Sequence, residues 1–263
     1  MSLQNQTDAA DAALYALNWQ EREVAFPFNK GSVTYVFRRA QNQVWIGNEP
    51  VNEAARFYEM SKSETVIKRG GVREDHGDSS EAYAWLWDRL ALRAFITKED
   101  GTTQDIDLTP ETRKTIKPIH KELGVNATCA YRCEVLEDRT EETLSGGNYF
   151  VRVYHGSAKA EALVGVFCVS FWDELTRRKH KNSIVQRSER RGTDLVSTID
   201  PAIFPMAEMF DKLVQSVEGA GVFDGEGNGK PATLEDLRKN ADFFLKVDLM
   251  AALITHWEDR TGK

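Results

Sequence analysis

The sequence carries the same series of predicted elements twice: a strand pair, a polar region, an amphipathic helix, a glycine-containing turn and a capped helix. Short segments also align: Val36-Phe37 with Val166-Phe167, Trp87-Asp88-Arg89-Leu90 with Phe210-Asp211-Lys212-Leu213, and Lys121 with Lys246. Two repeats are too few for a solenoid. The pattern predicts two similar lobes or one pseudo-symmetric domain; the alternative is chance similarity between two ordinary α+β halves.

The predicted fold class is therefore α+β, with two similar halves that are each a β-hairpin followed by amphipathic helices. We assign residues 1–20 to an acidic N-terminal lead, residues 21–133 to the first repeat and residues 148–263 to the second. The boundary rests on the acidic and polar stretch 134–147, which ends in Ser145-Gly146-Gly147. Either half is long enough to bury a core of its own.

Both hairpins are visible as runs of β-forming residues on either side of a turn. Residues 24–28 and 33–37 flank a glycine-containing turn and predict the first hairpin. Proline donates no backbone hydrogen bond, so Pro27 indicates that its strand lies at a sheet edge. Residues 149–154 and 163–171 predict the second hairpin.

Apolar residues at helical spacing predict the helices. The predicted spans are 52–60, 81–95, from Pro110 to 127, 206–217 and from Leu234 to 252, with a polar loop over 69–80. Thr109 before Pro110 and Thr233 before Leu234 are N-cap candidates. Asp236 resembles the acidic member of a capping box.

The charge balance limits the classes of partner. The net charge is −7 and the isoelectric point about 5.4, which makes nucleic-acid binding unlikely as a general function because phosphate contact needs clustered positive charge. The exception is a basic run that contains Arg177, Arg178, Lys179, His180, Lys181, Arg187, Arg190 and Arg191. This run is either a solvated surface or a docking patch for an acidic partner.

The N-terminal segment and the number of cysteines indicate the cellular compartment. The N-terminus lacks the basic start and apolar middle of a signal peptide. Three cysteines, Cys129, Cys133 and Cys168, do not suit a disulfide framework. No run of about 18 apolar residues predicts a membrane-spanning helix. We expect reduced thiols, no membrane association and a cytoplasmic location.

The strongest motif match is a calcium-binding loop. Residues from Asp224 to Glu235 place oxygen ligands at positions 1, 3, 5 and 12 and glycine at position 6, between two predicted helices. Glu226 is longer than the usual ligand at its position, and Pro231 occupies position eight. A flexible Gly/Asn/Asp turn is the alternative, so calcium binding is an alternative function.

Other candidates for metal or catalytic chemistry are weaker. Cys129 and Cys133 are expected on one helix face with His120 nearby, but a closed zinc site needs four ligands, and buried small side chains are favoured. The acidic stretch 74–78, with His76, either binds a cation or is a solvated loop. We expect no catalytic residue, no metal ligand and no cofactor; an enzyme of unrecognised class is the alternative.

Tryptophans supply the candidate partner-binding residues. Trp85 and Trp87 are two apart on a predicted helix, so they point about 200° apart and one should leave the core face. Trp45 and Trp172 follow the two hairpins. Each is either a core anchor or an interface anchor. The partner-binding candidates are Trp45, Trp85, Trp172, Arg177, Arg178 and Lys181.

Three features resemble proteins encoded near the tail genes of phages and prophages. They are the hairpin from Phe26 to Phe37 with Arg38-Arg39 after it, the segment Trp87-Asp88-Arg89-Leu90, and the ending His256-Trp257-Glu258-Asp259. The resemblance implies a non-catalytic structural or assembly role through protein–protein contacts, with virion or tail components as partners. It also implies a place in a phage-like particle as an alternative to the cytoplasm, and it leaves self-association open.

Overall fold

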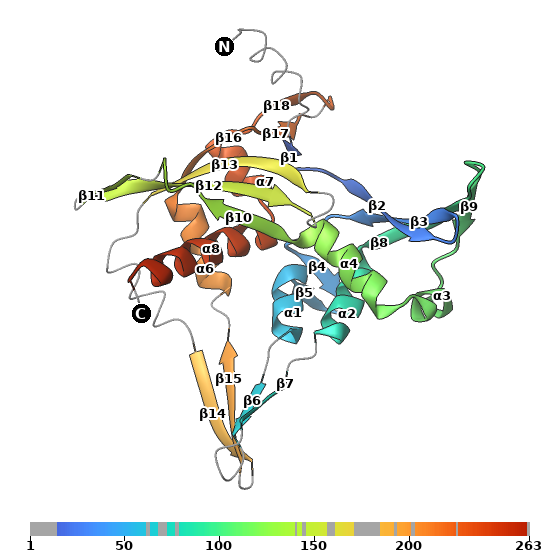
Figure 1. The fold of residues 1–263 in the computed structure, drawn as a ribbon, viewed down its shortest axis with the longest axis horizontal. Coiled ribbons are helices and arrows are strands. Elements are labelled where there is room, and N and C mark those ends of the chain that lie inside the picture. Colours follow the sequence, from blue (N-terminus) through green and yellow to red (C-terminus); the bar gives the residue numbers. More distant parts are fainter. Residues whose placement is uncertain are drawn as a thin grey trace.

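The computed structural model places two antiparallel sheets side by side, each with helices packed on one face (Figure 1). Helices and antiparallel strands are both abundant, so the predicted α+β class is confirmed. The structure describes residues 15–61, 64–67, 73–76, 79–139, 141–143, 146–156, 161–170, 185–191, 194–200, 203–224 and 226–261.

The first sheet has the strand order β2-β3-β8-β9. Its strands are β2 (Glu21–Phe28), β3 (Gly31–Arg38), β8 (Ala91–Thr97) and β9 (Thr103–Ile106). β2 and β3 form the predicted hairpin, and its turn holds Asn29 at a φ of 52°, a conformation that asparagine tolerates. β2 is the edge strand, as Pro27 predicts.

In the described part of the first half, four helices and a small hairpin accompany this sheet. They are α1 (Glu53–Met60), α2 (Ser80–Leu90), α3 (Pro110–Thr115) and α4 (Pro118–Cys129), with β4 (Val44–Ile46) paired to β5 (Glu49–Val51). The predicted N-cap of α3 is confirmed, because Thr109 Oγ1 accepts a hydrogen bond from the Thr112 N–H.

The second sheet has the order β10-β12-β13-β16, with β11 also paired to β12. Its strands are β10 (Tyr131–Val135), β11 (Glu141–Thr143), β12 (Gly146–His155), β13 (Ala162–Ser170) and β16 (Val214–Glu218). The predicted hairpin is thus β12–β13. β10 begins inside the range assigned to the first repeat, so one sheet draws strands from both sides of the polar stretch 134–147.

The second half contains three described helices and an added small sheet. The helices are α6 (Ile203–Leu213), α7 (Leu234–Asn240) and α8 (Phe243–Thr261), and the small sheet joins β1 (Tyr15–Ala16), β17 (Ala220–Phe223) and β18 (Gly229–Pro231). Thr233 caps α7, and its reciprocal hydrogen bonds with Asp236 confirm the capping box.

Two helices end earlier than their apolar spacing predicts. α2 ends at Leu90 instead of 95, and α6 ends at Leu213 instead of 217, and a strand follows each helix without a loop. Ala94 and Val217 are still packed on the core, but from strands. The helical spacing of apolar residues extends past the end of each helix, because a buried residue in the following strand falls by chance at the next helical position.

Two predicted long helices are each split into two. The segment opened by Pro110 ends at Thr115, because Pro118 begins a new helix, α4, at a position where its missing N–H costs nothing. The segment opened by Leu234 ends at Asn240. There Asp242 accepts a hydrogen bond from the Leu245 N–H at 2.9 Å and so caps the start of α8.

A four-stranded arm projects from the helical side of the molecule (Figure 1). It has the order β14-β15-β6-β7 and joins β6 (Glu64–Ile67) and β7 (Arg73–His76) of the first half to β14 (Val185–Arg191) and β15 (Asp194–Asp200) of the second. In each half the arm hairpin lies between the sheet hairpin and the helix α2 or α6. Strand β7 falls in the stretch expected to be a polar loop.

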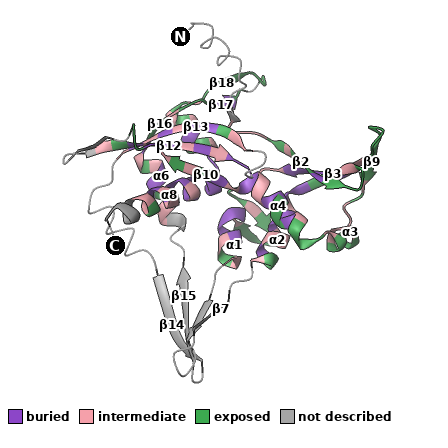
Figure 2. Cartoon of the chain, in the orientation of Figure 1, coloured by how far each residue is buried: buried purple, intermediate pink, exposed green. Residues whose placement is uncertain are grey.

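The apolar core runs through both halves, and buried residues are concentrated between sheets and helices (Figure 2). Trp87 is completely buried and packs edge-on against Tyr35 and Phe37. In the second half Phe210 packs against Phe167, and both are completely buried.

Gly124 of α4 packs directly against the rings of this core. A Cβ at this position would lie 2.7 Å from Cζ of Phe37 and 3.2 Å from the ring of Trp87. We predict that Gly124→Ala lowers the free energy of unfolding by about 1–2 kcal/mol, because overpacking outweighs the gain in helix propensity. Gly229→Ala is the control, since no atom lies within 4 Å of its Cβ. Urea denaturation of the two variants would contradict this if Gly124→Ala were as stable as the control.

Candidate functional site

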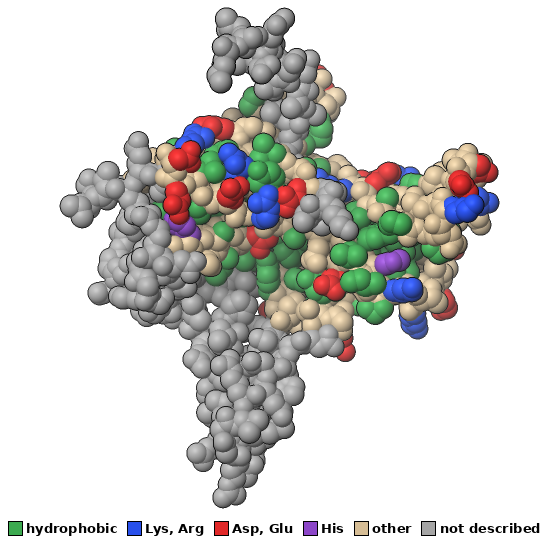
Figure 3. Space-filling view, viewed as in Figure 1, with side chains coloured by type: hydrophobic (Ala, Val, Ile, Leu, Met, Phe, Trp, Pro, Cys, Tyr) green, Lys and Arg blue, Asp and Glu red, His purple; other side chains and the backbone are tan. Residues whose placement is uncertain are grey.

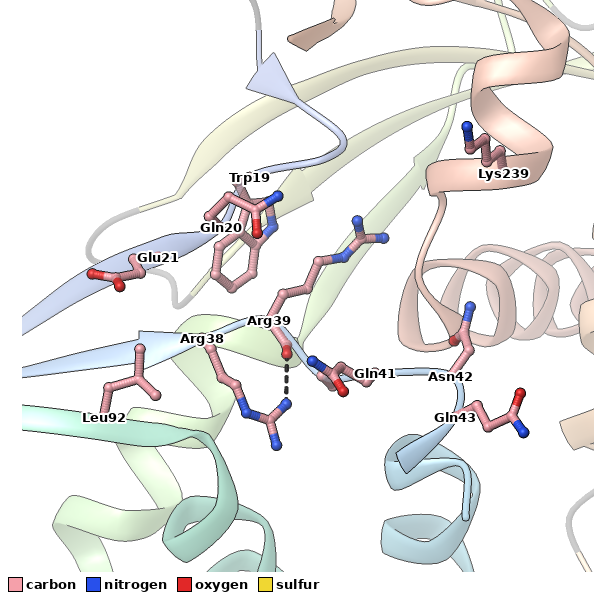
Figure 4. A pocket seen from close by; sticks show the side chains of 11 residues that line it. Trp19, Gln20, Glu21, Arg38, Arg39, Gln41, Asn42, Gln43, Leu92 and Lys239 are labelled. Atoms are coloured by element: carbon pink, nitrogen blue, oxygen red, sulfur yellow. Dashed lines mark hydrogen bonds between the residues drawn. The ribbon is translucent and has the colours of Figure 1, made fainter. Parts of the chain in front are cut away.

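A pocket of about 500 Å³ lies where the two halves meet (Figure 4). We call it the junction pocket. The start of β2 and the segment after β3 form most of its wall, and Lys239 of α7 reaches it from the second half. Its other lining residues are Trp19, Gln20, Glu21, Arg38, Arg39, Ala40, Gln41, Asn42, Gln43 and Leu92. Hydrogen-bonding side chains dominate this wall.

Arg38 is fixed in the wall by a buried carboxylate. It donates to both oxygens of Glu53 at 2.7 and 2.8 Å, and Arg89 donates to the same carboxylate at 3.0 Å. Burial alone would raise the pKa of Glu53, but hydrogen bonds from Arg38 and the Gln41 N–H hold it below its usual value. The charge of Arg38 is therefore compensated within the fold.

Arg39 points the other way and links the two halves. Its guanidinium donates to the carbonyl oxygen of Asn240, at the end of α7. Its Nε lies 3.7 Å from the carboxylate of Asp242, at the start of α8. Figure 4 shows this side chain between Trp19 and the helix that carries Lys239. Arg39 thus fixes the position of the second half relative to β3.

Two buried donors at this pocket have no hydrogen-bond acceptor among the described protein groups. They are Nε1 of Trp19 and Nε of Arg39. A buried donor without an acceptor costs about 1–3 kcal/mol. The charge of Arg39 is balanced by Asp242, whose carboxylate lies 3.7 Å from its Nε, so the positive charge that this pocket can offer a small oxyanion comes from Lys239.

Behind the pocket, His155 at the end of β12 connects the halves through a buried ring. Its Nε2 donates to the carbonyl of Thr128 at 2.8 Å, and its Nδ1 accepts from Arg22 of β2. The ring stacks on Tyr131 with centroids 4.5 Å apart. Burial, assisted by the charge of Arg22, lowers the pKa of His155 to about 3, so the ring is neutral.

Two carboxylates, that of Asp242 just before α8 and that of Asp248 within it, accept hydrogen bonds from Tyr131. Asp242 accepts from the Tyr131 hydroxyl at 2.5 Å. Asp248 accepts from the Tyr131 N–H at 3.0 Å and from the Tyr58 hydroxyl at 3.2 Å. Burial raises the pKa of Asp248 to about 7 despite these hydrogen bonds. The cluster therefore joins α1, β10 and α8 through polar groups that cross the boundary between the halves.

Two cysteine thiols, those of Cys129 and Cys133, are also buried from solvent. Burial raises the pKa values of the Cys129 and Cys133 thiols far above the usual range, so both thiols are neutral. Cys129 ends α4 and Cys133 lies on β10, so they do not share a helix face as expected. Within the described residues, no group of three or more His, Cys, Asp or Glu side chains is placed to hold a metal ion.

The partner-binding candidates from the sequence differ in how far they are exposed to solvent. Trp45 lies on the β4–β5 hairpin with 67% of its surface exposed. Trp85 is half-buried on α2 and still packs against the core, whereas Trp87 is completely buried in it, so neither ring of the pair leaves the core fully. Trp85 and Ile46 line a second pocket of about 510 Å³, beside the exposed hairpin. Trp172, Arg177, Arg178 and Lys181 lie outside the described residues.

The loop that resembles a calcium site has different surroundings from those expected. It connects strands β17 and β18 instead of two helices. Asp224 uses its carboxylate on its own loop, accepting from the N–H groups of Glu226 and Asn228 at 2.9 and 2.8 Å. Glu235 lies in the first turn of α7. Calcium binding by this loop stays a prediction.

Sequence reasoning missed the junction pocket and the buried polar cluster. Arg39 and Asp242 are about two hundred residues apart, as are Tyr58 and Asp248, and no local pattern joins them. The only signal available was the pair Arg38-Arg39 directly after a predicted strand. One arginine faces Glu53 and the other faces α8, as alternating side chains in an extended segment do.

Comparison of the chain with protein-family models, with curated proteins and with solved structures finds no match. Among the described residues, no helix is both long enough and apolar enough to cross a membrane.

We predict that His155 and Asp248 give opposite contributions to the pH dependence of stability. The pKa of His155 in the folded protein is below its ordinary value. The neutral ring therefore stabilises the fold above pH 6.5, and this stabilisation is lost as the pH falls toward 3. The pKa of Asp248 in the folded protein is above its ordinary value. The protonated carboxyl therefore stabilises the fold near pH 4, and this stabilisation is lost as the pH rises to 7.

Chemical denaturation of His155→Gln and Asp248→Asn from pH 4 to 8 measures this difference. Relative to the wild type, His155→Gln should gain stability toward low pH and Asp248→Asn toward high pH, each by more than about 1 kcal/mol. Parallel curves for the two variants would show that neither group titrates as its burial requires.

Proposed function

We propose that this chain is a non-catalytic assembly protein that acts through protein–protein contacts and is built from two similar halves. The observation that carries the proposal is an aromatic–Asp–Lys arrangement that occurs at the same place in each half. The first half contacts the second through α1 and β10, so the chain already contains one contact between such units.

In the first half, Lys121 of α4 reaches Asp88 at the end of α2. Its Nζ lies 3.2 Å from the carboxylate and 5.3 Å from the ring centre of Trp87. In the second half, Lys246 of α8 lies 2.7 Å from Asp211 and 5.7 Å from the ring centre of Phe210. Both lysines are almost fully buried, and the intervals between partners are 33 and 35 residues.

A shared irregularity in the sheets supports the same correspondence. In the first sheet, β8 begins at Ala91 opposite Phe37 and bulges at its second residue. In the second sheet, β16 begins at Val214 opposite Val169 and also bulges at its second residue. In this register Phe37 corresponds to Val169. The sequence alignment had instead set Phe37 against Phe167, two positions earlier.

The contact surfaces available in the described residues favour protein partners. The β4–β5 hairpin presents Trp45 and Ile46, the former two-thirds exposed, beside the pocket that Trp85 lines. Tryptophan contributes strongly at interfaces because it buries a large area. The resemblance to phage and prophage tail-associated proteins makes structural or assembly components of a virus-like particle the proposed partner class, met in the cytoplasm or within the particle.

We predict that Trp45→Ala abolishes capture of this partner while the free energy of unfolding changes by less than about 0.5 kcal/mol. The measurement is affinity capture of proteins encoded by neighbouring genes, with light scattering to determine the mass of the complex. Phe223→Ala is the matched control, since Phe223 is also half-exposed but lies on β17. Equal capture by Trp45→Ala and the wild type would contradict the assignment of this hairpin.

The junction pocket supports a second candidate function, binding of a small oxyanion. The specific observation is that Trp19, Arg39 and Lys239 line the same pocket and that Nε1 of Trp19 and Nε of Arg39 are buried without a hydrogen bond to a described protein group. We predict that calorimetry with pyrophosphate detects binding to the wild type and a loss of at least about tenfold in affinity for Arg39→Gln and Trp19→Phe. The second variant removes only the indole N–H donor, so unchanged affinity there would remove this candidate.

A further inference from the structure

The loop between β17 and β18 contains the only asparagine in the sequence that is followed by glycine, Asn228-Gly229. Both residues are exposed, and a Cβ at Gly229 would meet no atom within 4 Å beyond its chain neighbours. The hairpin lies at the top of the molecule in Figure 1, and its atoms are on the visible surface in Figure 3. Asparagine is a chemically labile residue, and a following glycine hinders an approach to its side chain least.

The strand register leaves the backbone N–H of Gly229 outside the ladder between β17 and β18. The N–H of Asp224 donates to the carbonyl oxygen of Asn228 at 3.0 Å, so these two residues form a hydrogen-bonded pair. In antiparallel strands such pairs alternate with pairs that exchange no hydrogen bond. The adjacent pair, Phe223 with Gly229, is therefore of the second kind, and the Gly229 N–H points away from β17.

The neighbouring groups agree with this register. The N–H and the carbonyl of Phe223 both turn away from β18 and bind the side-chain amide of Asn18, each at 2.8 Å. Pro231 also occupies a position without a ladder hydrogen bond, where its missing N–H costs nothing. β18 is the edge strand of the sheet β1-β17-β18. Among the described residues, no strand therefore lies on the side to which the Gly229 N–H points.

The side-chain amide of Asn228 is held less firmly than its main chain. Its Nδ2 donates to Oδ2 of Asp224 at 3.3 Å, longer than the about 2.7–3.2 Å of an ordinary N–H···O hydrogen bond. Oδ1 of Asp224 accepts the backbone N–H of Asn228 at 2.8 Å. Hydrogen bonds from the N–H groups of Asn228 and Glu226 hold the pKa of Asp224 below its usual value, so this carboxylate is charged.

We propose that Asn228 is a modification site at which this chain deamidates without an enzyme, through the backbone nitrogen of Gly229. The residues on the page meet the requirements of that reaction: the amide is exposed, the next residue has no side chain, and its N–H is not engaged in the ladder. The proposal does not depend on the proposed function, since the loop lies on β17–β18 and the Trp45 hairpin is β4–β5.

The reaction has two steps and needs only water. The backbone nitrogen of Gly229 gives its proton to a base in solution and forms a bond to Cγ of Asn228. The bond from Cγ to Nδ2 breaks, and the amide nitrogen takes up a proton from water and leaves as ammonia. Water then adds to one of the two carbonyl carbons of the cyclic succinimide and breaks its bond to nitrogen. Opening at one carbonyl gives aspartate, and opening at the other gives isoaspartate.

Both products change the hairpin at its turn. Each replaces the Nδ2 donor with a carboxylate beside the charged Asp224, and like charges at such a distance repel. Isoaspartate also lengthens the main chain just before β18, which moves Lys230 out of register with Val222. We expect β18 to separate from β17. Strand β17 keeps its pairing with β1 and its hydrogen bonds to Asn18, because these lie on its other side.

Incubation of the full chain in water labelled with heavy oxygen, at neutral and at mildly alkaline pH, tests the reaction. Mass spectrometry of proteolytic fragments should find labelled aspartate and isoaspartate at Asn228, formed faster at the higher pH because the attacking nitrogen must lose its proton. Asn126 is the internal reference, since it lies in α4 and its amide oxygen accepts from the Tyr83 hydroxyl. An Asn228 that stays intact, that reacts no faster than Asn126, or that gives aspartate without isoaspartate overturns the proposal.

Two variants of neighbouring residues assign the attacking nitrogen. Gly229→Val should slow the conversion at least about tenfold, because a branched side chain restricts the backbone and hinders the approach to Cγ. Lys230→Val is the matched control: it places the same side chain one residue further along the exposed strand and should leave the rate unchanged. Equal rates in the two variants would show that the nitrogen of Gly229 does not attack.

The effect on the hairpin is measured on the modified chain, which ion exchange separates by its additional negative charge. The N–H of Ala232 donates to the carbonyl oxygen of Ala220 at 2.9 Å, so it reports whether β18 stays on β17. In the modified chain this N–H should exchange with solvent deuterium at least about tenfold faster, whereas that of Val151 in β12 should not change. Unchanged exchange at Ala232 would overturn the effect on β18, and partner capture through Trp45 is measured independently.

Discussion

A buried lysine imposes a strict condition on its surroundings, and the arrangement of helices in both halves depends on it. An ammonium group can leave water only if a carboxylate meets it, and its alkyl stem needs an apolar surface. Lys121 and Lys246 satisfy both needs with an aspartate and an aromatic ring on the preceding long helix. A shift of either helix along its neighbour would separate the charges. Each ion pair therefore fixes the position of α4 against α2 or of α8 against α6.

The contact between the halves is polar as well as apolar. Arg39, His155 and Asp248 each bond across it, and none is fully exposed. Groups of this kind restrict the geometry because each needs its partner at a particular distance and angle. An apolar contact alone would tolerate sliding. The polar cluster thus explains how the N-terminal and C-terminal halves hold one defined relation to each other.

The uncovered positions of the first half follow from the order of the chain. β10 follows α4 directly and pairs with β12, so the first half supplies a cover for the second. Among the described residues, no strand pairs with the outer edge of β2. On the same half, Ile119 and Leu123 of α4 stay partly exposed.

The sequence by itself determined the local elements: the hairpin turn at Asn29, the caps at Thr109 and Thr233, and the edge strand with Pro27, because each depends on residues within one turn or one strand. It also contained the aromatic, aspartate and lysine residues of the two buried ion pairs at similar spacing. It did not determine where α2 and α6 end, because strand pairing with distant residues replaces the helix there. Nor did it reveal that Arg39 meets Asp242 or that β10 covers α8. Those contacts join segments that are far apart in the chain. Only the tertiary structure decides which distant groups are buried together.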